Sequence, residues 1–220
     1  MPFGKWTGFN NGLRSSIVAS CPGTIPHGTC DQLFWISDVA PTFCEAAGKK
    51  YNKEVFDGKS QWQNFLGKNR KVHEYAYGAF SNCNIIDNRK RIFPIRVIRD
   101  KKYSLIWSPN HKEYTSNTNL TEVYNKVTGV TDASKKGSMA GSWLDTVDGD
   151  PMKDALIKKL IKRPEWALYD RENDPHEMKN LVDDPKLADT RKRLQDELMK
   201  WLEKWGDTDP IKTEKGLVKK

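Results

Sequence analysis

Aromatic and β-branched residues alternate with polar ones from His73 to Phe80 and again from Phe93 to Trp107. This period of two predicts β-strands, and Asp100-Lys101-Lys102 has the composition of a hairpin turn within the second run. Trp166 to Tyr169 predicts a last strand. The pattern therefore predicts a small antiparallel sheet.

Apolar residues at helical spacing mark the carboxy-terminal part of the chain. A long amphipathic helix is expected to open at Asp184-Pro185 and to end at Gly206. Its apolar stripe consists of Leu187, Leu194, Leu198, Trp201 and Trp205. A second helix is expected from Pro151 to Arg163. Its apolar side consists of Met152, Leu156 and Leu160.

Shorter elements are expected before the sheet. Ser16 to Ser20 is a β-branched run that predicts a buried strand. Asp38 is expected to cap a helix that Gly48 ends, and Ser60 to cap a short helix over 61–66. The face of the first helix consists of Val39, Phe43 and Ala47.

Two segments are too polar to predict a core element. Residues 108–150 are rich in Asn, Thr, Ser and Gly, which favours a long excursion that decorates the sheet. The tail after Gly206 is charged and is expected to lie over the surface or to stay mobile.

Composition adds a preference for anionic partners. The 220 residues carry 37 Lys and Arg against 29 Asp and Glu, a net charge of +8 that suits sulfated polysaccharides, nucleic acid or acidic membranes. Many of these charges interleave with opposite ones, as in 184–205, so a solvated surface explains them equally well. No nucleic-acid motif accompanies the charge.

Compartment is left open by the cysteines and the amino terminus. No apolar run has the length of a membrane span and no signal-peptide pattern opens the sequence, so the chain is expected to be soluble. A signal of a longer parent would precede it. Cys21 and Cys30 flank a turn-rich segment that fits either a disulfide or two free thiols. The absence of a CxxC pair disfavours a zinc site.

Four separated segments carry a family resemblance. They are Gly4-Lys5-Trp6-Thr7-Gly8-Phe9-Asn10-Asn11-Gly12-Leu13-Arg14, Ser37-Asp38-Val39-Ala40-Pro41-Thr42-Phe43, Asp57-Gly58-Lys59-Ser60 and Trp166-Ala167-Leu168-Tyr169-Asp170-Arg171-Glu172-Asn173-Asp174-Pro175-His176-Glu177. In this order they resemble the back half of sulfatases of the alkaline-phosphatase-like superfamily. Phe93 to Ile98 and Lys162 to Trp166 resemble the heparan N-sulfatase (sulfamidase) branch and its bacterial relatives more than the arylsulfatases.

The resemblance implies an α/β fold that is α+β in this portion. Residues 1–70 would be the tail end of the catalytic α/β domain, including the end of its sheet. Residues 71–209 would be the carboxy-terminal subdomain, a small antiparallel sheet packed on the long helix, and 210–220 a charged tail.

The family's nucleophile and metal are expected upstream of this chain. Sulfatases use a formylglycine made within Cys/Ser-x-Pro-x-Arg, and this sequence contains no such motif. Their calcium ligands would also precede Met1. Calcium and formylglycine are thus cofactors of the parent, and this chain alone is expected to be inactive and to bind no metal.

Lys5 is the expected catalytic residue, because the family's lysine carries a compact charge that can neutralise a sulfuryl oxygen. Asn82, Asn84 and Arg89 are expected to bind the sugar, since they lie where related enzymes contact substrate. Sulfamidases tend to have histidines there. Arg14 and the four histidines, His27, His73, His111 and His176, are expected to be structural or solvated.

The resemblance implies a parent that hydrolyses sulfate esters or N-sulfate (sulfamate) groups of heparan-type glycans, and that is secreted, periplasmic or lysosomal. The alternative is a non-catalytic module, either a split-gene product or a domain that binds sulfated glycans. Expected partners are a sulfated glycan substrate, an amino-terminal sulfatase half, and a second copy of this chain. Neither nucleic acid nor a membrane is expected as a partner.

Overall fold

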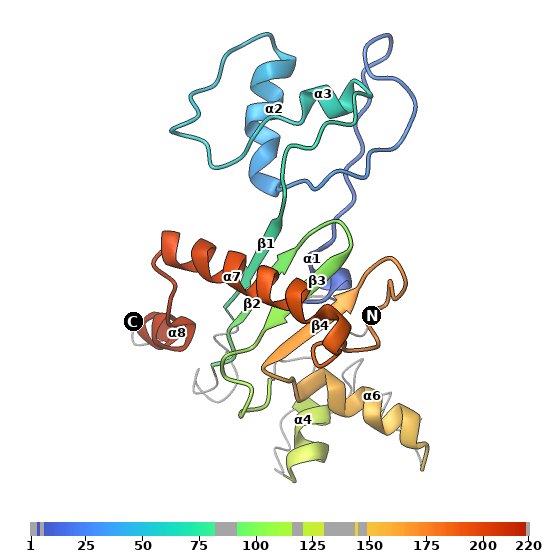
Figure 1. Cartoon of the computed structure of the whole chain (residues 1–220), viewed down its shortest axis with the longest axis vertical. Helices are drawn as coiled ribbons and strands as arrows, with labels where there is room; N and C mark the ends of the chain where they lie inside the picture. Colours follow the sequence, from blue (N-terminus) through green and yellow to red (C-terminus); the bar gives the residue numbers. More distant parts are fainter. Residues whose placement is uncertain are drawn as a thin grey trace.

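A four-stranded antiparallel sheet forms the centre of the protein (Figure 1). The computed structural model describes residue 4 and residues 7–81, 92–115, 121–129, 144 and 149–218. The strands are β1 (Ala76–Phe80), β2 (Ile95–Arg99), β3 (Tyr103–Trp107) and β4 (Trp166–Asp170), paired in that order. The sheet predicted from the alternating pattern is therefore confirmed.

The predicted hairpin joins β2 and β3. The Asp100 amide donates to the Tyr103 carbonyl at 3.1 Å. The Asp100 side chain in turn accepts from the amides of Lys102 and Tyr103. An aspartate suits this position because its short side chain satisfies turn amides that the strand ladder leaves open.

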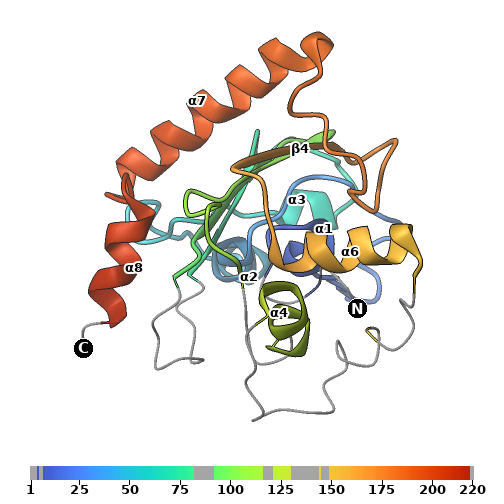
Figure 2. The ribbon, with the colours of Figure 1, turned by 90° about the horizontal axis from the view of Figure 1, so that it is seen from below.

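Both faces of the sheet are covered, and every residue of β2 is consequently buried. Helix α7 (Ala188–Lys204) lies across one face, and helix α1 (Asn10–Leu13) lies on the other (Figure 2). The side chains that α7 buries against the sheet are Leu194, Leu198 and Leu202. On the opposite face Phe9 packs into a separate apolar core with strand residues. The sheet is thus the middle of three layers.

The long helix follows its sequence prediction closely. A short 3₁₀ turn, η3 (Pro185–Leu187), leads into α7, and the Asp184 side chain accepts from the Lys186 amide. Gly206 adopts a left-handed conformation with φ of 69° just after the helix. No helix in the described parts of the chain is long and apolar enough to cross a membrane.

Helix α6 (Pro151–Ile161) also begins where it was predicted, with the Asp150 side chain accepting from the Met152 amide at 3.0 Å. Its buried side chains are Ile157, Leu160 and Ile161, which pack with helix α4 (Thr121–Thr128). Of the predicted apolar side, Leu160 is buried as expected, whereas Met152 is 75% exposed, so its assignment to that side is wrong. Helix α4 lies within 108–150, the segment expected to be a long excursion.

The charged tail is more ordered than its composition suggested. Residues Pro210–Val218 form helix α8, in which Glu214 is completely buried. The guanidinium of Arg96 on β2 lies 2.5 Å from Asp207 and 3.6 Å from Glu214. Burial raises the pKa of Glu214 to about 7, and Arg96 only partly offsets this. A charged partner on β2 therefore attaches the tail to the body.

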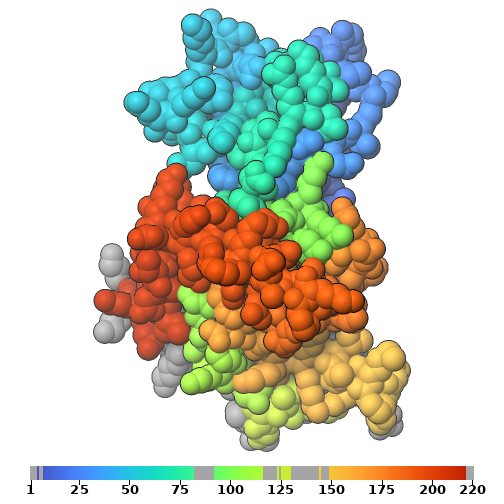
Figure 3. Space-filling view, viewed as in Figure 1, coloured from blue at the N-terminus to red at the C-terminus, as the bar shows by residue number. Residues whose placement is uncertain are grey.

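The residues between α1 and β1 form a separate lobe above the sheet (Figures 1 and 3). It contains the 3₁₀ turn η1 (Ile36–Asp38), helix α2 (Val39–Ala46) and helix α3 (Trp62–Phe65). The Ser60 side chain accepts from the Trp62 amide at 3.1 Å, but α3 has Gln61 in its cap position, so Ser60 lies one residue before the expected cap.

Two expectations for this lobe are wrong. Residues 16–20 form no strand, and Val18 is 93% exposed, because no strand in the described part of the chain pairs with this run. Phe43 of α2 is 69% exposed, whereas Pro41 and Thr42 are buried, so the helix buries a different face from the one predicted. Cys21 and Cys30 are exposed free thiols.

The packing of α7 on the sheet makes a first prediction. Leu198→Ala should lower the free energy of unfolding by about 2–5 kcal/mol, since Leu198 is completely buried and alanine would leave a cavity. Urea unfolding followed by circular dichroism measures this change. Met199→Ala, next along the helix but 37% exposed, is the control and should cost less than about 1 kcal/mol. Equal losses in the two variants would contradict the packing described above.

Candidate functional site

The residues singled out as site residues from the sequence, Lys5, Asn82, Asn84 and Arg89, lie outside the described residues. Their roles therefore stay predictions. The structure does describe the neighbours of Lys5, namely Gly4 and Thr7 onward. We call residues 4–14 the lysine segment and describe how the fold holds its described part.

The lysine segment lies on the sheet face opposite α7 (Figure 2). Phe9 is its main apolar anchor, with 6% of its surface exposed, and its ring lies 5.7 Å from the ring of Tyr169 on β4. Helix α1 has only four residues and no side-chain cap. So short a helix is unstable alone, and tertiary contacts must hold it in place.

Two cations lie over the Phe9 ring, Lys159 of α6 and Arg163 just after that helix. Lys159 Nζ lies 5.5 Å and Arg163 Cζ 4.6 Å from the ring centroid, distances at which a cation is attracted to the aromatic face. Burial lowers the pKa of Arg163 to about 10, so the guanidinium keeps its charge at neutral pH. Lys159 Nζ also donates to the carbonyls of Glu177 and Met178.

Arg99 of β2 donates hydrogen bonds to two residues of the lysine segment. Its Nη2 donates to the Gly8 carbonyl at 3.0 Å, and its Nη1 donates to Asn10 Oδ1 at 2.9 Å. A planar guanidinium can make both bonds at once, which an ammonium on a flexible chain cannot do with the same geometry. Arg99 is 6% exposed, so little water competes for these donors.

Glu177, which follows β4 in the sequence, contacts both Asn10 and Arg99. Its Oε2 accepts from the Asn10 amide at 2.5 Å, and its Oε1 lies 3.7 Å from Arg99 Nη2. Glu177 is 1% exposed and has a φ of 53°, an uncommon conformation for a residue with a side chain. The first and fourth resembling segments therefore meet at one buried carboxylate.

Burial dominates the electrostatics of this pair. It raises the pKa of the Glu177 carboxyl, an effect that Arg99 and the Asn10 amide only partly offset. It also lowers the pKa of Arg99 to about 10, against the opposing effect of Glu177. The guanidinium nevertheless stays charged at neutral pH. A buried pair of this kind is more informative about a fixed arrangement than about added stability.

Gly12 lies close to the backbone of Gly4 and Thr7. A β-carbon at position 12 would lie 2.6 Å from the Thr7 carbonyl oxygen and 2.7 Å from that of Gly4. Only glycine fits so close to this backbone. Thr7 Oγ1 also donates to the Gly4 carbonyl at 2.7 Å. The residues on both sides of Lys5 are thus held by contacts from within the lysine segment.

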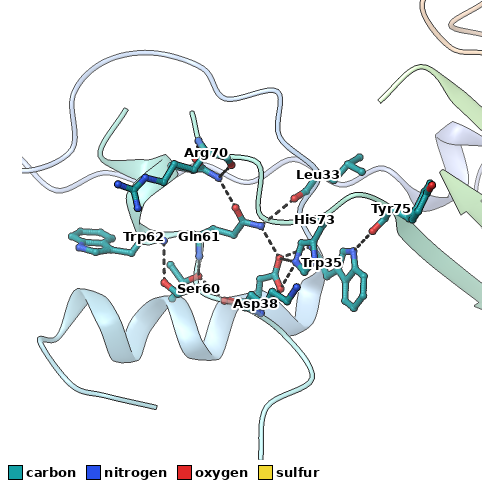
Figure 4. Close-up of polar contacts among 12 residues, drawn as sticks. Leu33, Trp35, Asp38, Ser60, Gln61, Trp62, Arg70, His73 and Tyr75 are labelled. Carbon is teal, nitrogen blue, oxygen red and sulfur yellow. Dashed lines mark hydrogen bonds and ion pairs between the residues drawn. The ribbon is translucent and has the colours of Figure 1, made fainter. Parts of the chain in front are cut away.

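A second buried carboxylate, Asp38, organises the upper lobe (Figure 4). It accepts from the amides of Trp35 and Lys59, at 2.9 and 2.8 Å. It also accepts from Gln61 Nε2 at 2.9 Å, and His73 Nε2 lies 2.8 Å from Oδ2. Asp38 was expected to cap α2, but its side chain makes no cap bond to that helix.

The second and third resembling segments meet at this carboxylate. A β-carbon at Gly58 would lie 2.1 Å from the Ser37 carbonyl oxygen, so glycine is required where the two segments touch. Burial alone would raise the pKa of Asp38, but its hydrogen bonds to His73, Gln61 and the two amides leave the pKa below its ordinary value. Asp38 is therefore ionised at neutral pH.

A column of aromatic rings connects Asp38 to α7. His73 stacks on Trp35 with centroids 4.2 Å apart, and Trp35 meets Tyr77 of β1 edge-on at 5.8 Å. Tyr77 stacks on Trp201 of α7 at 4.8 Å. The Trp35 indole also donates to the Tyr75 carbonyl at 3.0 Å. The column fixes the lobe on the sheet, and His73 is structural as expected.

No metal centre accompanies these carboxylates in the described part of the chain, where no group of three or more His, Cys, Asp or Glu side chains could hold an ion. The Asp38 carboxylate instead accepts from protein donors, and Glu177 Oε2 accepts from the Asn10 amide. The described residues therefore do not fit the calcium that the resemblance implies, and we assign no step through calcium to them.

Sequence reasoning named the segments that form these two clusters but missed the residues at their centres. Asp38 was expected only to cap a helix, and Glu177 appeared in a resembling motif without an assigned role. The one local signal is Glu177 in a turn-rich run after β4. Its partner Asn10 is 167 positions away, beyond the range of any periodicity.

Comparison with curated proteins finds relatives of one class. An ulvan-active sulfatase of Formosa agariphila is 32% identical over 209 residues, which cover 93% of this chain and 36% of that protein. The human N-sulphoglucosamine sulphohydrolase is 26% identical over 125 residues, which cover 54% of this chain and 21% of that protein. The chain thus spans between 21% and 36% of the length of these two relatives.

The family of the carboxy-terminal part of N-sulphoglucosamine sulphohydrolase matches residues 151–204. Among solved structures, a 2-O GAG sulfatase aligns with a TM-score of 0.45 and 19% identity, over 77% of this chain and 25% of that one. The sequence matches identify the chain as part of a sulfatase. It is a carboxy-terminal sulfatase portion, because the matched family is that of the carboxy-terminal part, and the matched range holds α6, β4 and all of α7.

The Asp38 cluster makes a prediction with a defined pH dependence. Asp38→Asn should lower the free energy of unfolding at pH 7 by roughly 3–5 kcal/mol, because an amide cannot replace a buried charged acceptor. The folded pKa lies below the ordinary 3.8, so the contribution of Asp38 is present above about pH 4 and is lost as the pH falls through the folded value. Urea unfolding at several pH values tests this.

The control for this experiment is Asp31→Asn, an exposed carboxylate of the same lobe, which should change the stability by less than about 0.5 kcal/mol. The difference between wild type and Asp38→Asn should shrink in acid. A difference that grew as the pH fell would contradict the direction of the Asp38 pKa.

Proposed function

We propose that this chain is part of a sulfatase that hydrolyses sulfate esters or N-sulfate groups of heparan-type glycans, with Lys5 as its contribution to the reaction. The observation that carries the proposal is the anchoring of the lysine segment by Arg99 of β2 and by Glu177, which belongs to another segment with a sulfatase resemblance. A fold that merely displayed basic residues to a polyanion would have no need to fix this backbone.

The chemistry proposed for Lys5 is electrostatic. Sulfuryl transfer places negative charge on oxygen, and an ammonium group with three donors stabilises that charge when it is held in position. In this proposal formylglycine supplies the nucleophile and calcium a further positive charge, both from another part of the protein. Lys5 binds and orients the sulfuryl group. Asn82, Asn84 and Arg89 bind hydroxyl and sulfate groups of the sugar.

The names of the relatives support a sulfated glycan as the substrate class, since one is an ulvan-active sulfatase and the other an N-sulphoglucosamine sulphohydrolase. We also propose an amino-terminal sulfatase part as a partner. Ile17 and Val18, 45% and 93% exposed, support it, because an extended apolar run without a partner strand in the described chain is a surface that another strand can cover. Residues 1–70 would then complete a catalytic domain.

The proposal predicts activity that requires both parts. The chain is assayed with a sulfated chromogenic substrate and calcium, alone and with an amino-terminal sulfatase part that carries the formylglycine. Turnover is expected in the complex, and Lys5→Ala should reduce kcat by about 10²–10³-fold. Lys5→Arg, which keeps the charge but changes its shape, is the matched control and should lose less.

Three outcomes would oppose this function. Turnover by the chain alone would show that the nucleophile does not come from another part. Full activity of the Lys5→Ala complex would remove Lys5 from the mechanism. A complex without turnover, together with tight and salt-dependent binding of heparan oligosaccharides by the chain alone, would support the non-catalytic binding module instead.

A further inference from the structure

Glu177 and Arg99 lie in the carboxy-terminal subdomain, yet their polar contacts reach the segment that carries Lys5. We propose that these two are positioning residues, through which the subdomain sets the place of the catalytic lysine. The inference rests on the proposed role of Lys5. It adds that the subdomain takes part in catalysis by fixing a backbone, in addition to any contact with the sugar.

The geometry supports a fixed position because three hydrogen bonds converge on Gly8 and Asn10, the two neighbours of Phe9. Arg99 donates to the Gly8 carbonyl and to Asn10 Oδ1, and Glu177 accepts from the Asn10 amide. Phe9 lies between them with its ring buried against Tyr169. A backbone carbonyl, a backbone amide and two side chains are thus fixed together, which leaves residues 8–10 little freedom to shift.

The constraint extends from residues 8–10 to Gly4 and Thr7 through Gly12. Gly12 lies against the Gly4 and Thr7 carbonyl oxygens, and its amide donates to the Phe9 carbonyl at 2.9 Å. Residues 8–10 are held by the sheet, Gly12 is held by Phe9, and the backbone on both sides of Lys5 lies against Gly12. A displacement of Asn10 would therefore be transmitted to Gly4 and Thr7, the described residues on either side of Lys5.

The expected loss of rate depends on how far the catalytic group is displaced. A catalytic group displaced by about 1 Å can lose on the order of 10²-fold in rate, because stabilisation of the transition state depends on alignment. A positioning residue should therefore change kcat more than KM. In this proposal Glu177 acts on the backbone of the lysine segment and not on the substrate.

Hydrogen exchange tests the positioning without any activity assay. In the chain as it stands, Glu177→Gln should speed exchange of the Asn10 amide by about tenfold or more, since a charged acceptor becomes a neutral one. Arg99→Lys should speed exchange across residues 8–13, because lysine cannot make both hydrogen bonds of the Arg99 guanidinium. This variant replaces Glu177→Gln in the test if Glu177→Gln does not fold. Both are measured under conditions where circular dichroism shows a folded chain.

The control variant is Glu214→Gln. Glu214 is also a buried glutamate beside a buried β2 arginine, Arg96, but Arg96 pairs with the tail and not with the lysine segment. Glu214→Gln should leave exchange of the Asn10 amide unchanged. If Glu177→Gln and Glu214→Gln speed it equally, the effect is general destabilisation and the positioning role is wrong.

The same variants in the complex with the amino-terminal part separate the two proposals. Glu177→Gln is expected to lower kcat by about 10-fold to 10²-fold with KM nearly unchanged, while Glu214→Gln leaves both unchanged. If Lys5→Ala abolishes turnover but Glu177→Gln alters neither kcat nor exchange, the function stands and the positioning fails. If Lys5→Ala has no effect, the proposed function itself fails.

Discussion

A buried carboxylate that receives the amide of a residue 167 positions earlier is the contact around which this protein is arranged. Glu177 and Arg99 together fix Gly8 and Asn10, and that contact seats the lysine segment on one face of the sheet while α7 covers the other. So short a helix as α1 depends on tertiary contacts, and this one acts together with the packing of Phe9 against Tyr169. Glu177 and Arg99 are costly to bury. Burial raises the pKa of Glu177 and lowers that of Arg99, and both shifts favour the neutral form of the side chain. A protein retains such a pair where a defined arrangement matters more than the last increment of stability.

The upper lobe is also organised by a buried carboxylate, that of Asp38. Four donors from three separate stretches of chain converge on its carboxylate. The ring column of His73, Trp35, Tyr77 and Trp201 then connects this cluster to α7. The four segments that resemble sulfatases thus meet in two pairs, the first with the fourth at Glu177 and the second with the third at Asp38. These segments specify two buried acceptors, and one of them, Glu177, contacts the segment that contains Lys5.

Local patterns were sufficient for the elements whose partners are near in sequence. The β2–β3 hairpin, the Pro at the start of α6 and the Gly after α7 are set by a few neighbouring residues, and each appears where it was predicted. The strand at 16–20 and the buried face of α2 depend on what covers them, which a hydrophobic pattern does not reveal. Of the candidate site, Lys5 could be named from its motif. Arg99 and Glu177 could not, because an arginine in a strand and a glutamate in a turn are ordinary until tertiary structure brings them together.

The measurement that tests this account most directly is a double-mutant cycle between Arg99 and Glu177, with Arg99→Gln, Glu177→Gln and the double variant unfolded in urea. If the two side chains hold the lysine segment as one unit, their effects should be coupled by at least about 1 kcal/mol, with the double variant less destabilised than the sum of the singles. Effects that add to within about 0.3–0.5 kcal/mol would contradict the account, because independent residues cannot form a shared anchor.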